Sequence, residues 1–274
     1  MNRVYVITGA TSGIGKALVK ELATDNIVYA GYRSENKVSE LSLISENVKP
    51  FYVDYAKPET VSEAINFIKT SCNKIDCLIN VAGCVVAGPI EKIPVSEIRR
   101  QFDVNVFGHL EMAQGLAEIL ENGKIINVSS MASYGVFPYI SPYCASKRCL
   151  DMFFNSFLNE NKRNIKVVSI KPGVISTPLW DKSVKENAGS LTNCEGYEKE
   201  MEFMIANAKR NEEKGLSVEE VVKTILIADN ADNPKLTYTV GKDAFSARIF
   251  SKLPQFLINK LIKLGLKIRI NKQN

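Results

Sequence analysis

The chain has 274 residues, of which 45% are hydrophobic and 24% are charged. These values are ordinary for a soluble globular protein and argue against long disordered regions, and one α/β domain can reach this length. The net charge of +5 comes from the C-terminal end, because seven Lys or Arg and no Asp or Glu occur from Arg248 onward. Residues 1–247 then hold 28 bases against 30 acids, so we expect no nucleic-acid partner for the body of the protein.

Cysteine and histidine usage argues against a metal site. The six cysteines form no C-x-x-C pair and the chain has one histidine, so no metal is expected and the thiols are typical of a reducing compartment. The apolar stretch 4–7 is too short for a signal peptide, and no run approaches the ~18 apolar residues of a membrane span. We therefore expect a cytoplasmic protein, or one on a membrane face reached from the cytosol.

A glycine-rich turn follows the first apolar segment. Residues 4–8 predict a central parallel strand, residues 9–15 read Gly-Ala-Thr-Ser-Gly-Ile-Gly, and residues 16–23 have a helical pattern. Glycines let the backbone approach a pyrophosphate closely, and the N-terminus of the helix supplies unpaired N–H groups. The spacing is Gly-x-x-x-Gly-x-Gly rather than Gly-x-Gly-x-x-Gly, and a plain tight turn remains the alternative.

The tip of the second predicted strand, residues 26–33, indicates the cofactor. An acid at this point would bind the 2'-hydroxyl of an adenosine ribose, but Tyr32 stands there and Arg33 follows. A guanidinium suits a 2'-phosphate, which favours NADP(H) over NAD(H). Glu35 is the competing acid, but it falls in the first turn of an expected helix, where a carboxylate interacts favourably with the helix dipole.

Two further strands are predicted at residues 51–54 and 75–81, separated by a helix at 59–71 that follows Pro58. The first ends in Asp54, which could accept a hydrogen bond from an adenine amino group. The second leads into Asn80-Val81-Ala82-Gly83, small residues suited to a backbone that passes close to a cofactor. A plain αβ turn is equally consistent with this local pattern.

Residues 95–121 have the pattern of one long amphipathic helix. Asn105 falls among its apolar residues and therefore needs hydrogen-bond partners. His109, the only histidine, follows one turn later. A lone histidine on a helix is more often packed than catalytic, and we assign it no proton-transfer role.

A hydroxyl, a phenol and an ammonium then follow in the chain. Ser130 ends a predicted strand at 124–129, and Tyr143 and Lys147 lie four residues apart on a predicted helix at 143–160, so they share one face. A free tyrosine has a pKa of about 10, and a neighbouring cation favours its phenolate. Together these groups would make a carbonyl-reducing site, although Tyr-x-x-x-Lys by itself can occur by chance on a solvated helix.

The C-terminal part of the chain alternates less regularly. Residues 165–170 and 236–240 predict two more strands, and Ser217 is expected to cap a helix at 218–228. The polar segment 179–214 breaks the alternation, which predicts an insertion over the cleft at the strand ends.

In their order and spacing these motifs resemble the short-chain dehydrogenase/reductase family over residues 3 to about 245, with similarity to its 17-beta-hydroxysteroid and retinol dehydrogenase-like members. Asn80-Val81-Ala82-Gly83 departs from the family's Asn-Asn-Ala-Gly at Val81. The resemblance implies four active-site residues, which are Asn105, Ser130, Tyr143 and Lys147. It also implies a cofactor-binding set made up of Thr8, Gly9, Thr11, Ser12, Gly13, Ile14, Gly15, Arg33, Asp54, Asn80, Ala82, Gly83, Tyr143, Lys147, Pro172, Gly173 and Thr177.

The family's chemistry implies a role for each active-site residue. Tyr143 would exchange the proton of the alcohol as general acid or base, and Ser130 would hold the same oxygen. Lys147 would lower the pKa of Tyr143 and bind the nicotinamide ribose, while Asn105 would hold a water in a proton relay. The partner is then a small carbonyl or alcohol substrate.

The implied fold is α/β: a doubly wound, mostly parallel sheet (Rossmann fold) in three α/β/α layers, forming a single domain at 1–247 with a lid insertion at about 179–214. A homodimer or homotetramer is expected by analogy. One alternative is a dinucleotide-sensing regulator or scaffold without catalysis, since the fold does not fix the function. Another is a sugar epimerase or dehydratase, which the glycine spacing disfavours.

The basic amphipathic segment 248–274 lies beyond this domain. At ~100° per residue Asn259, Lys260, Lys263 and Lys267 gather on one face, and leucines and isoleucines occupy most of the remainder. Such a helix suits peripheral contact with an anionic membrane, which would favour a lipophilic substrate resembling a steroid, retinoid or lipid. Packing on the core, on another subunit or over the substrate mouth remains open.

Overall fold

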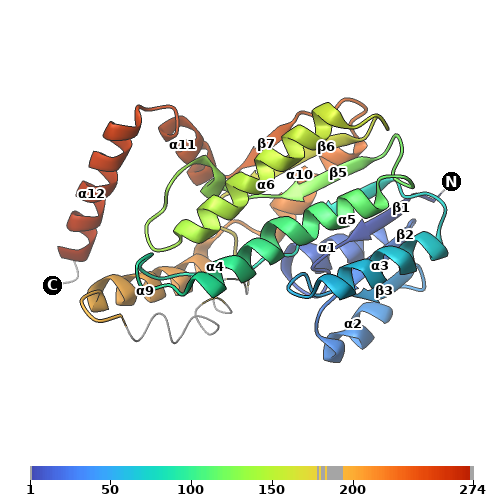
Figure 1. Ribbon diagram of the computed structural model, residues 1–274, viewed down its shortest axis with the longest axis horizontal. Coiled ribbons are helices and arrows are strands. Elements are labelled where there is room, and N and C mark those ends of the chain that lie inside the picture. The colour runs from blue at the N-terminus through green and yellow to red at the C-terminus, as the bar shows by residue number, and fades with distance from the viewer. Residues whose placement is uncertain (1, 178, 180–182, 184–193, 272–274) are drawn as a thin grey trace.

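The polypeptide is organised around a seven-stranded parallel sheet with strand order β3-β2-β1-β4-β5-β6-β7 (Figure 1). The computed structural model describes residues 2–177, 179, 183 and 194–271. The strands are β1 (Val4–Ile7), β2 (Ile27–Tyr32), β3 (Val48–Tyr52), β4 (Cys77–Asn80), β5 (Lys124–Val128), β6 (Lys166–Pro172) and β7 (Thr237–Val240). The predicted doubly wound α/β fold in one domain is confirmed.

Helices connect the strands and cover both faces of the sheet, as Figure 1 shows. The α-helices are α1 (Gly13–Leu22), α2 (Val38–Ser42), α3 (Pro58–Ser71), α4 (Val95–Phe102), α5 (Gly108–Leu116), α6 (Ser141–Glu160), α9 (Glu198–Lys214), α10 (Val218–Asn230), α11 (Lys242–Phe250) and α12 (Gln255–Asn271). Short helical segments are η1 (Glu35–Lys37), η2 (Asp103–Phe107) and η3 (Met131–Tyr134). Ser217 caps α10 as predicted, because its hydroxyl accepts a hydrogen bond from the Glu220 N–H at 3.3 Å.

Alternate residues of the central strands enter two separate hydrophobic cores. Tyr5 and Ile7 of β1 pack in the core with α1, α2 and α10, whereas Val6 between them packs in the core with α3, α5 and α6. This alternation follows from the period of two along a strand. Because both faces are covered, β1 is apolar on both sides, as the sequence indicated.

The third strand begins earlier than predicted and contains a proline. β3 pairs with β2 from Val48, and its end brings Tyr52 beside Tyr32. Pro50 lacks an N–H donor. This is tolerated because β3 is an edge strand, which has no neighbouring strand on its outer side. The predicted range of 51–54 was therefore wrong at both ends.

The single long helix predicted at 95–121 is divided into three parts. A π-helical turn, η2, separates α4 from α5 and contains Asn105. A π turn inserts one extra residue per turn and shifts the direction of the side chains that follow, and such turns are frequent at functional sites. The prediction of one continuous helix was wrong because its periodicity does not reveal this insertion.

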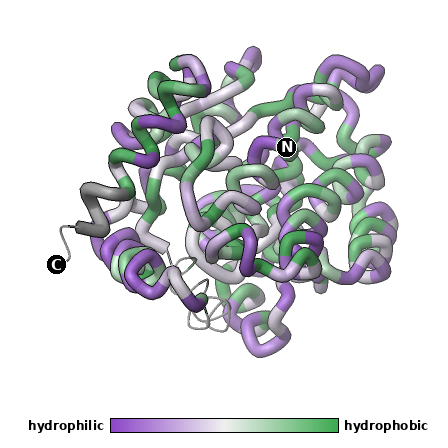
Figure 2. The backbone as a smooth tube through the Cα atoms, turned by 60° about the vertical axis from the view of Figure 1, so that its left-hand side comes forward, coloured by the Kyte–Doolittle hydropathy of each residue, from purple (hydrophilic) through white to green (hydrophobic). Residues whose placement is uncertain are grey.

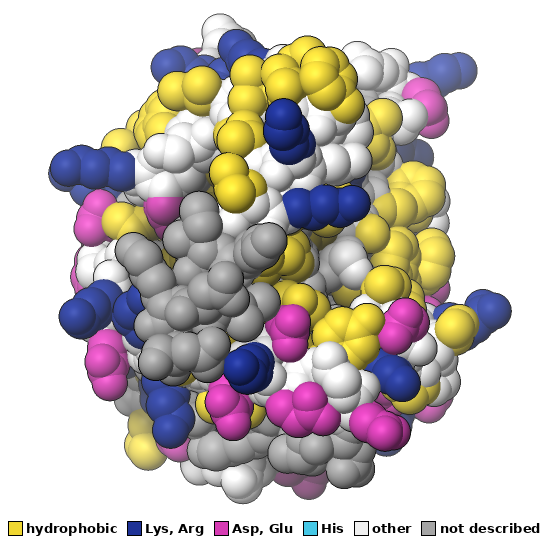
Figure 3. Space-filling view, turned by 90° about the vertical axis from the view of Figure 1, so that its left-hand side faces the viewer, with side chains coloured by type: hydrophobic (Ala, Val, Ile, Leu, Met, Phe, Trp, Pro, Cys, Tyr) yellow, Lys and Arg dark blue, Asp and Glu magenta, His cyan; other side chains and the backbone are white. Residues whose placement is uncertain are grey.

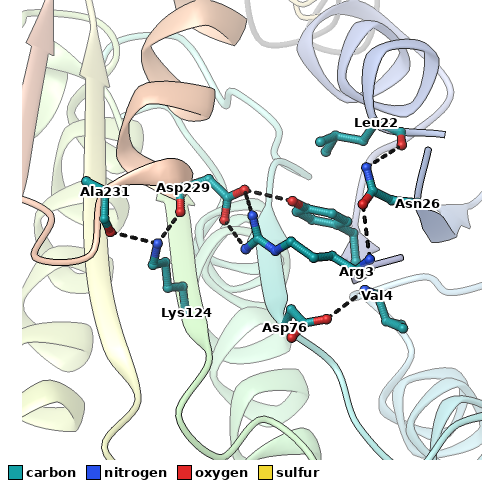
Figure 4. Close-up of polar contacts among 9 residues, drawn as sticks. Arg3, Val4, Leu22, Asn26, Asp76, Lys124, Asp229 and Ala231 are labelled. Atoms are coloured by element: carbon teal, nitrogen blue, oxygen red, sulfur yellow. Dashed lines mark hydrogen bonds and ion pairs between the residues drawn. The ribbon is translucent and has the colours of Figure 1, made fainter. Parts of the chain in front are cut away.

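The N-terminal ends of the strands are fastened by a buried carboxylate (Figure 4). Asp229, at the end of α10, accepts hydrogen bonds from both terminal nitrogens of Arg3 at 2.6 and 2.7 Å and from the Tyr5 hydroxyl at 2.8 Å. Lys124 donates to the Ala231 carbonyl at 2.8 Å and to the Asp229 carbonyl. This cluster joins β1 and β5 to α10 at the amino ends of the strands, opposite the glycine turn.

The C-terminal segment forms α11 and α12, which extend along one side of the molecule (Figure 1). α12 contacts α9, and Ile258 near the start of α12 is buried. Figure 2 shows hydrophobic and hydrophilic residues mixed along α12. The predicted insertion at 179–214 includes α9, and residues 180–182 and 184–193 lie outside the described residues. No helix within the described ranges is long and apolar enough to cross a membrane.

Candidate active site

The strand order reverses between β1 and β4, and a cleft of about 470 Å³ opens there at the carboxyl ends of the strands. In open α/β sheets this switch point is where ligands bind, because loops from the two halves diverge around it. The turn after β1 supplies Gly9, and the turn after β4 supplies Ala82 and Gly83. The topology thus brings two predicted motifs together that are about 70 residues apart in sequence.

The glycine turn forms a tight cradle that side chains would fill. Gly9 has a φ of +65°, and a Cβ there would lie 2.9 Å from the backbone of Ala82. A Cβ on Gly15 would lie 2.2 Å from the Gly9 carbonyl oxygen. Gly13, with a φ of +48°, faces the side chain of Thr177. The backbone therefore lies close to the cleft at the N-terminus of α1, which fits the pyrophosphate of a dinucleotide.

The adenosine end of the cleft is basic. Arg33 and Lys37 both line it, together with Tyr32, Ser34 and Asp54. Asp54 is the only carboxylate among the described lining residues, and one of its oxygens accepts a hydrogen bond from the Ala56 N–H at 3.1 Å. Two cations at the end of β2 fit a phosphate better than a bare ribose hydroxyl.

The loop after β4 is held from behind by buried polar groups. The Thr8 hydroxyl accepts hydrogen bonds from the N–H groups of Val81 and Ala82 at 3.1 and 3.3 Å. The His109 Nε2 lies 2.8 Å from the Ala82 carbonyl oxygen, to which it donates as the neutral tautomer. Burial, with the Lys147 charge adding to it, lowers the pKa of His109 to about 3. His109 is therefore neutral near pH 7 and holds the backbone of the loop after β4.

Asn105 is fully engaged inside the protein. Its side-chain oxygen accepts from the Cys84 N–H at 2.9 Å, and its amide donates to the Cys84 carbonyl at 3.0 Å and to the Ser146 hydroxyl at 3.0 Å. The partners expected for a buried asparagine are therefore present. These bonds connect the π turn to the loop after β4 and to α6, the helix of Tyr143.

Tyr143, Ser130 and Lys147 line the same end of the cleft. Ser130 follows β5 and its hydroxyl accepts from the Ala132 N–H at 3.1 Å. The Lys147 ammonium donates to the Val128 carbonyl at 2.9 Å and lies 5.9 Å from the centre of the Tyr143 ring. All three side chains are almost wholly buried, so that their positions are fixed by packing.

Burial dominates the electrostatics of this trio. It raises the pKa of Tyr143 to about 12, although a hydrogen bond with Ser130 opposes the rise. It lowers the pKa of Lys147 to about 8, while the carboxylate of Asp151 opposes the fall. The net shift of the Tyr143 pKa is therefore upward, because desolvation of the phenolate is the largest contribution and the Ser130 hydrogen bond offsets only part of it.

Most of the predicted site residues line the cleft. These are Gly9, Thr11, Ser12, Gly13, Ile14, Arg33, Asp54, Ala82, Gly83, Ser130, Tyr143, Lys147, Pro172, Gly173 and Thr177. Four others, Thr8, Gly15, Asn80 and Asn105, are absent from its lining. Asn80 instead donates to the Asn127 side chain at 2.8 Å, and each of the four supports the wall from behind.

The sequence analysis missed two polar groups at the adenosine end, Ser34 and Lys37. A base four residues after Arg33 was the available signal for Lys37. That spacing does not show that the residue reaches the cleft, which it does at the end of the short helix η1.

Near Tyr143 the cleft adjoins a third hydrophobic cluster. Its buried members are Val85, Ala87, Ala132, Ile140, Tyr143, Cys144, Cys194 and Met201. Partly buried side chains from the insertion pack against it, among them Leu179, Tyr197, Met204 and Ile205. The phenol is therefore surrounded by apolar groups on the side away from the glycine turn.

The model of the short chain dehydrogenase family matches residues 3–188. The chain belongs to this family, and is an NAD(P)-dependent oxidoreductase that interconverts carbonyl and alcohol groups. The match spans the glycine turn, the Tyr143 and Lys147 pair and all strands but β7.

Individual relatives extend the comparison over the whole chain. The NADPH-dependent 3-dehydrocapnine reductase of Ornithobacterium rhinotracheale is 29% identical over 97% of this chain and 98% of its own length. The NADPH-dependent 1-acyldihydroxyacetone phosphate reductase of Saccharomyces cerevisiae is 32% identical over 66% of this chain and 63% of its own. A short chain dehydrogenase from Burkholderia cenocepacia, solved in complex with NADP, superposes with a TM-score of 0.72 over 95% of this chain and 97% of its own, at 24% identity, which supports the fold.

Proposed function

We propose that this protein is an NADP(H)-dependent oxidoreductase that interconverts a ketone or aldehyde with an alcohol, Tyr143 being its general acid and base. The observation that supports this most is the convergence of Tyr143, Ser130 and Lys147 on the cleft that begins at the glycine turn. When bound, the nicotinamide supplies or accepts the hydride. The protein then has to position the substrate oxygen and manage its proton.

Each residue has one task in this proposal. The Tyr143 hydroxyl donates its proton to the carbonyl oxygen in reduction and takes it back in oxidation. The Ser130 hydroxyl holds the same oxygen by a second hydrogen bond. The Lys147 ammonium binds the ribose of the nicotinamide, and Asn105 holds the loop and helix between which Lys147 lies. The apolar side chains of the third hydrophobic cluster, which surround the Tyr143 ring, exclude water from the site of proton transfer.

NADP(H) is preferred over NAD(H) in this proposal because Arg33 and Lys37 both line the adenosine end of the cleft. Two curated relatives are named as NADPH-dependent, and the Burkholderia cenocepacia structure contains NADP. An Asp or Glu at the tip of β2, which would bind the ribose hydroxyls of NAD, is replaced by Tyr32.

A lipophilic substrate is the second part of the proposal. The third hydrophobic cluster adjoins Tyr143, and the side chains of Leu179, Tyr197 and Met204 bring it to the insertion. The yeast relative is named for an acyl-bearing substrate. We infer that the described part of the insertion, Leu179 and residues 194–214, acts as a lid, and that an extended apolar group lies against this wall while its carbonyl faces Tyr143.

Self-association and membrane contact complete the proposal. Phe107 of η2 and Met152 and Phe153 of α6 are large apolar side chains that remain exposed. Both helical segments lie on one face of the sheet (Figure 1). A homodimer or homotetramer that forms through this face would bury these three side chains between its subunits. The basic segment 248–274 provides peripheral contact with anionic lipid from the cytoplasmic side.

A comparison of Tyr143→Phe with the unaltered chain tests the activity. We expect oxidation of NADPH by carbonyl probes, which include a 1-acyldihydroxyacetone phosphate, a steroid ketone and diacetyl, to fall at least tenfold in the variant. NADPH affinity, measured by fluorescence titration, stays nearly unchanged because the phenol is not needed to hold the phosphates. Tight NADPH binding by the unaltered chain, without turnover of any carbonyl or alcohol, would instead indicate a dinucleotide-sensing protein.

A further inference from the structure

The buried face of α6 bears a third titratable residue at the same spacing as the first two. Tyr143, Lys147 and Asp151 follow one another at intervals of four residues, and all three side chains are less than a tenth exposed. Residues four apart on a helix are neighbours on one face. Asp151 therefore lies one turn beyond Lys147, on the side away from Tyr143.

The carboxylate of Asp151 contacts two side chains of β6. Its oxygens accept a hydrogen bond from the Ser169 hydroxyl at 2.7 Å and pair with the Lys171 ammonium at 2.6 Å. The ammonium of Lys147 bonds to the carbonyl of Val128, and Val128 stands opposite Ile170, between Ser169 and Lys171. Lys147 and Lys171 thus lie at the same short stretch of β5 and β6. Asp151 forms its ion pair with Lys171.

The buried cation of Lys171 also contacts the segment that begins at Ser130. Its ammonium lies 4.6 Å from the centre of the Tyr134 ring, and the Tyr134 hydroxyl is 2.7 Å from that of Thr239 on β7. Tyr134 ends the short helix η3, for which Ser130 is the N-terminal cap. The ion pair therefore links α6 and β6 to the segment that positions the active-site hydroxyl.

We propose that Asp151 is a positioning residue for the hydride-transfer site, keeping Lys147 protonated while its ion pair with Lys171 holds the Ser130 segment in place. The proposal rests on the assignment of Lys147 to the site. It explains why two buried lysines, which would repel each other, both lie at the same short stretch of β5 and β6. A carboxylate between two cations offsets part of their desolvation.

The other groups around Lys147 do not replace this carboxylate. His109 on α5 is neutral, since burial lowers its pKa to about 3. Tyr143 is held as the phenol, with a pKa of about 12. The Cys84 thiol in the loop after β4 acts on the pKa of Lys147 in the same direction as Asp151, but less strongly. Lys171, on β6, is a cation and acts in the opposite direction.

Charge changes at the two partners should shift the titration of Lys147 in opposite directions. Asp151→Asn removes a negative charge, so the ammonium loses its proton at a lower pH. Lys171→Met removes a positive charge and leaves the carboxylate to Lys147, so the proton is lost at a higher pH. A merely structural role for the ion pair would predict no such pair of opposite shifts.

The experiment is an NMR titration of the protein labelled with [13Cε]lysine, with the Lys147 signal assigned by its absence in Lys147→Arg. The midpoint for the unaltered chain is expected at about 8. We expect it to fall by about one pH unit in Asp151→Asn and to rise in Lys171→Met. Asp151→Glu, which keeps the charge, should restore most of the original midpoint.

Asp229→Asn is the matched control, because Asp229 is also a buried, ion-paired carboxylate but lies at the opposite ends of the strands. It should leave the midpoint of Lys147 unchanged. An unchanged midpoint in folded Asp151→Asn would overturn the proposal, and if that variant does not fold, an unchanged midpoint in Lys171→Met would do so.

The NMR titration requires no substrate, so its result is separate from the proposed reaction. Where a carbonyl probe is turned over, the loss of reduction at high pH should begin at a lower pH in Asp151→Asn. If the NMR shifts occur without turnover of any carbonyl, Asp151 controls Lys147 and the proposed reaction is wrong.

Discussion

Arg33 and Lys37 are the two residues that we expect to set the choice between cofactors. Both line the adenosine end of the cleft, although only Arg33 was recognised from its place after β2. A guanidinium can donate two parallel hydrogen bonds to a phosphate, whereas the lysine contributes a single mobile charge. We therefore expect Arg33 to contribute more to the discrimination than Lys37.

Arg33→Ala should weaken NADPH binding far more than NADH binding. The expected loss of discrimination is ~1.5 to 3 kcal/mol, the range for hydrogen bonds to charged groups. Fluorescence titrations with both cofactors measure it directly. Lys37→Ala should shift the ratio in the same direction by less, and Lys20→Ala, an exposed base on α1, should not shift it. A preference for NADH in the unaltered chain would show that the cleft does not select the 2'-phosphate.

At the scale of single elements, the apolar residues of the tail helix α12 are partly buried against the protein and partly exposed to solvent. Ile258 in its first turn is buried, whereas Phe256, Leu261 and Leu264 are exposed beside Lys260 and Lys263. Figure 3 shows hydrophobic and basic side chains mixed over the upper part of this side of the molecule, with most acidic ones in the lower part. The helix therefore packs on the protein through one part of its surface and leaves a mixed apolar and basic part outside.

This arrangement predicts binding to anionic vesicles that depends on both kinds of residue. The full chain should sediment with vesicles containing phosphatidylserine at low salt and less at high salt, because surface charge adds ~1 kcal/mol per basic residue. A chain ending at Leu253 should not sediment under either condition.

Because that truncation also removes the packing of Ile258, point variants are the better control. The double variant Lys260→Glu/Lys263→Glu should lose the salt-dependent component of vesicle binding. The double variant Leu261→Ser/Leu264→Ser should bind vesicles more weakly at any salt concentration. If the full chain stays in the supernatant throughout, the tail has a structural role and the case for a lipophilic substrate rests on the apolar wall alone.

Across the whole molecule, the two ends of the parallel strands have separate tasks. Their carboxyl ends hold the cleft, and their amino ends are fastened by Asp229, Arg3, Tyr5 and Lys124 (Figure 4). Arg3 is near the start of the chain and Asp229 is 226 residues later, so this cluster joins β1 to the last helix before β7. It should therefore affect stability without affecting the chemistry.

Asp229→Asn should lower the free energy of unfolding by about 2 to 4 kcal/mol, because it leaves a buried end of Arg3 without its carboxylate. The upper part of the usual range is not expected, since one third of the Arg3 side chain remains exposed. Urea unfolding measures the change. Glu118→Gln, which breaks an exposed pair with Lys69, should change stability by less than about 0.5 kcal/mol. A loss of activity in folded Asp229→Asn would show that the two ends of the sheet are coupled.

The sequence by itself determined the order of strands and helices, the glycine turn and the positions of Ser130, Tyr143 and Lys147. These features are local, since each depends on a short run of residues whose period or spacing has one main structural solution. A parallel sheet is then expected, because a helix between two strands carries the chain back to the end at which the first strand began.

Only the tertiary structure decided how those residues are surrounded. The π turn at Asn105, the place of Lys37 in the cleft and the pairing of Asp151 with Lys171 each join segments that no local pattern relates. The same holds for the pKa of Tyr143, which rises although a lysine is near, because the burial of a phenol depends on packing from distant segments. Desolvation and partner geometry belong to the folded chain as a whole, and so they could not be obtained from the spacing of residues along it.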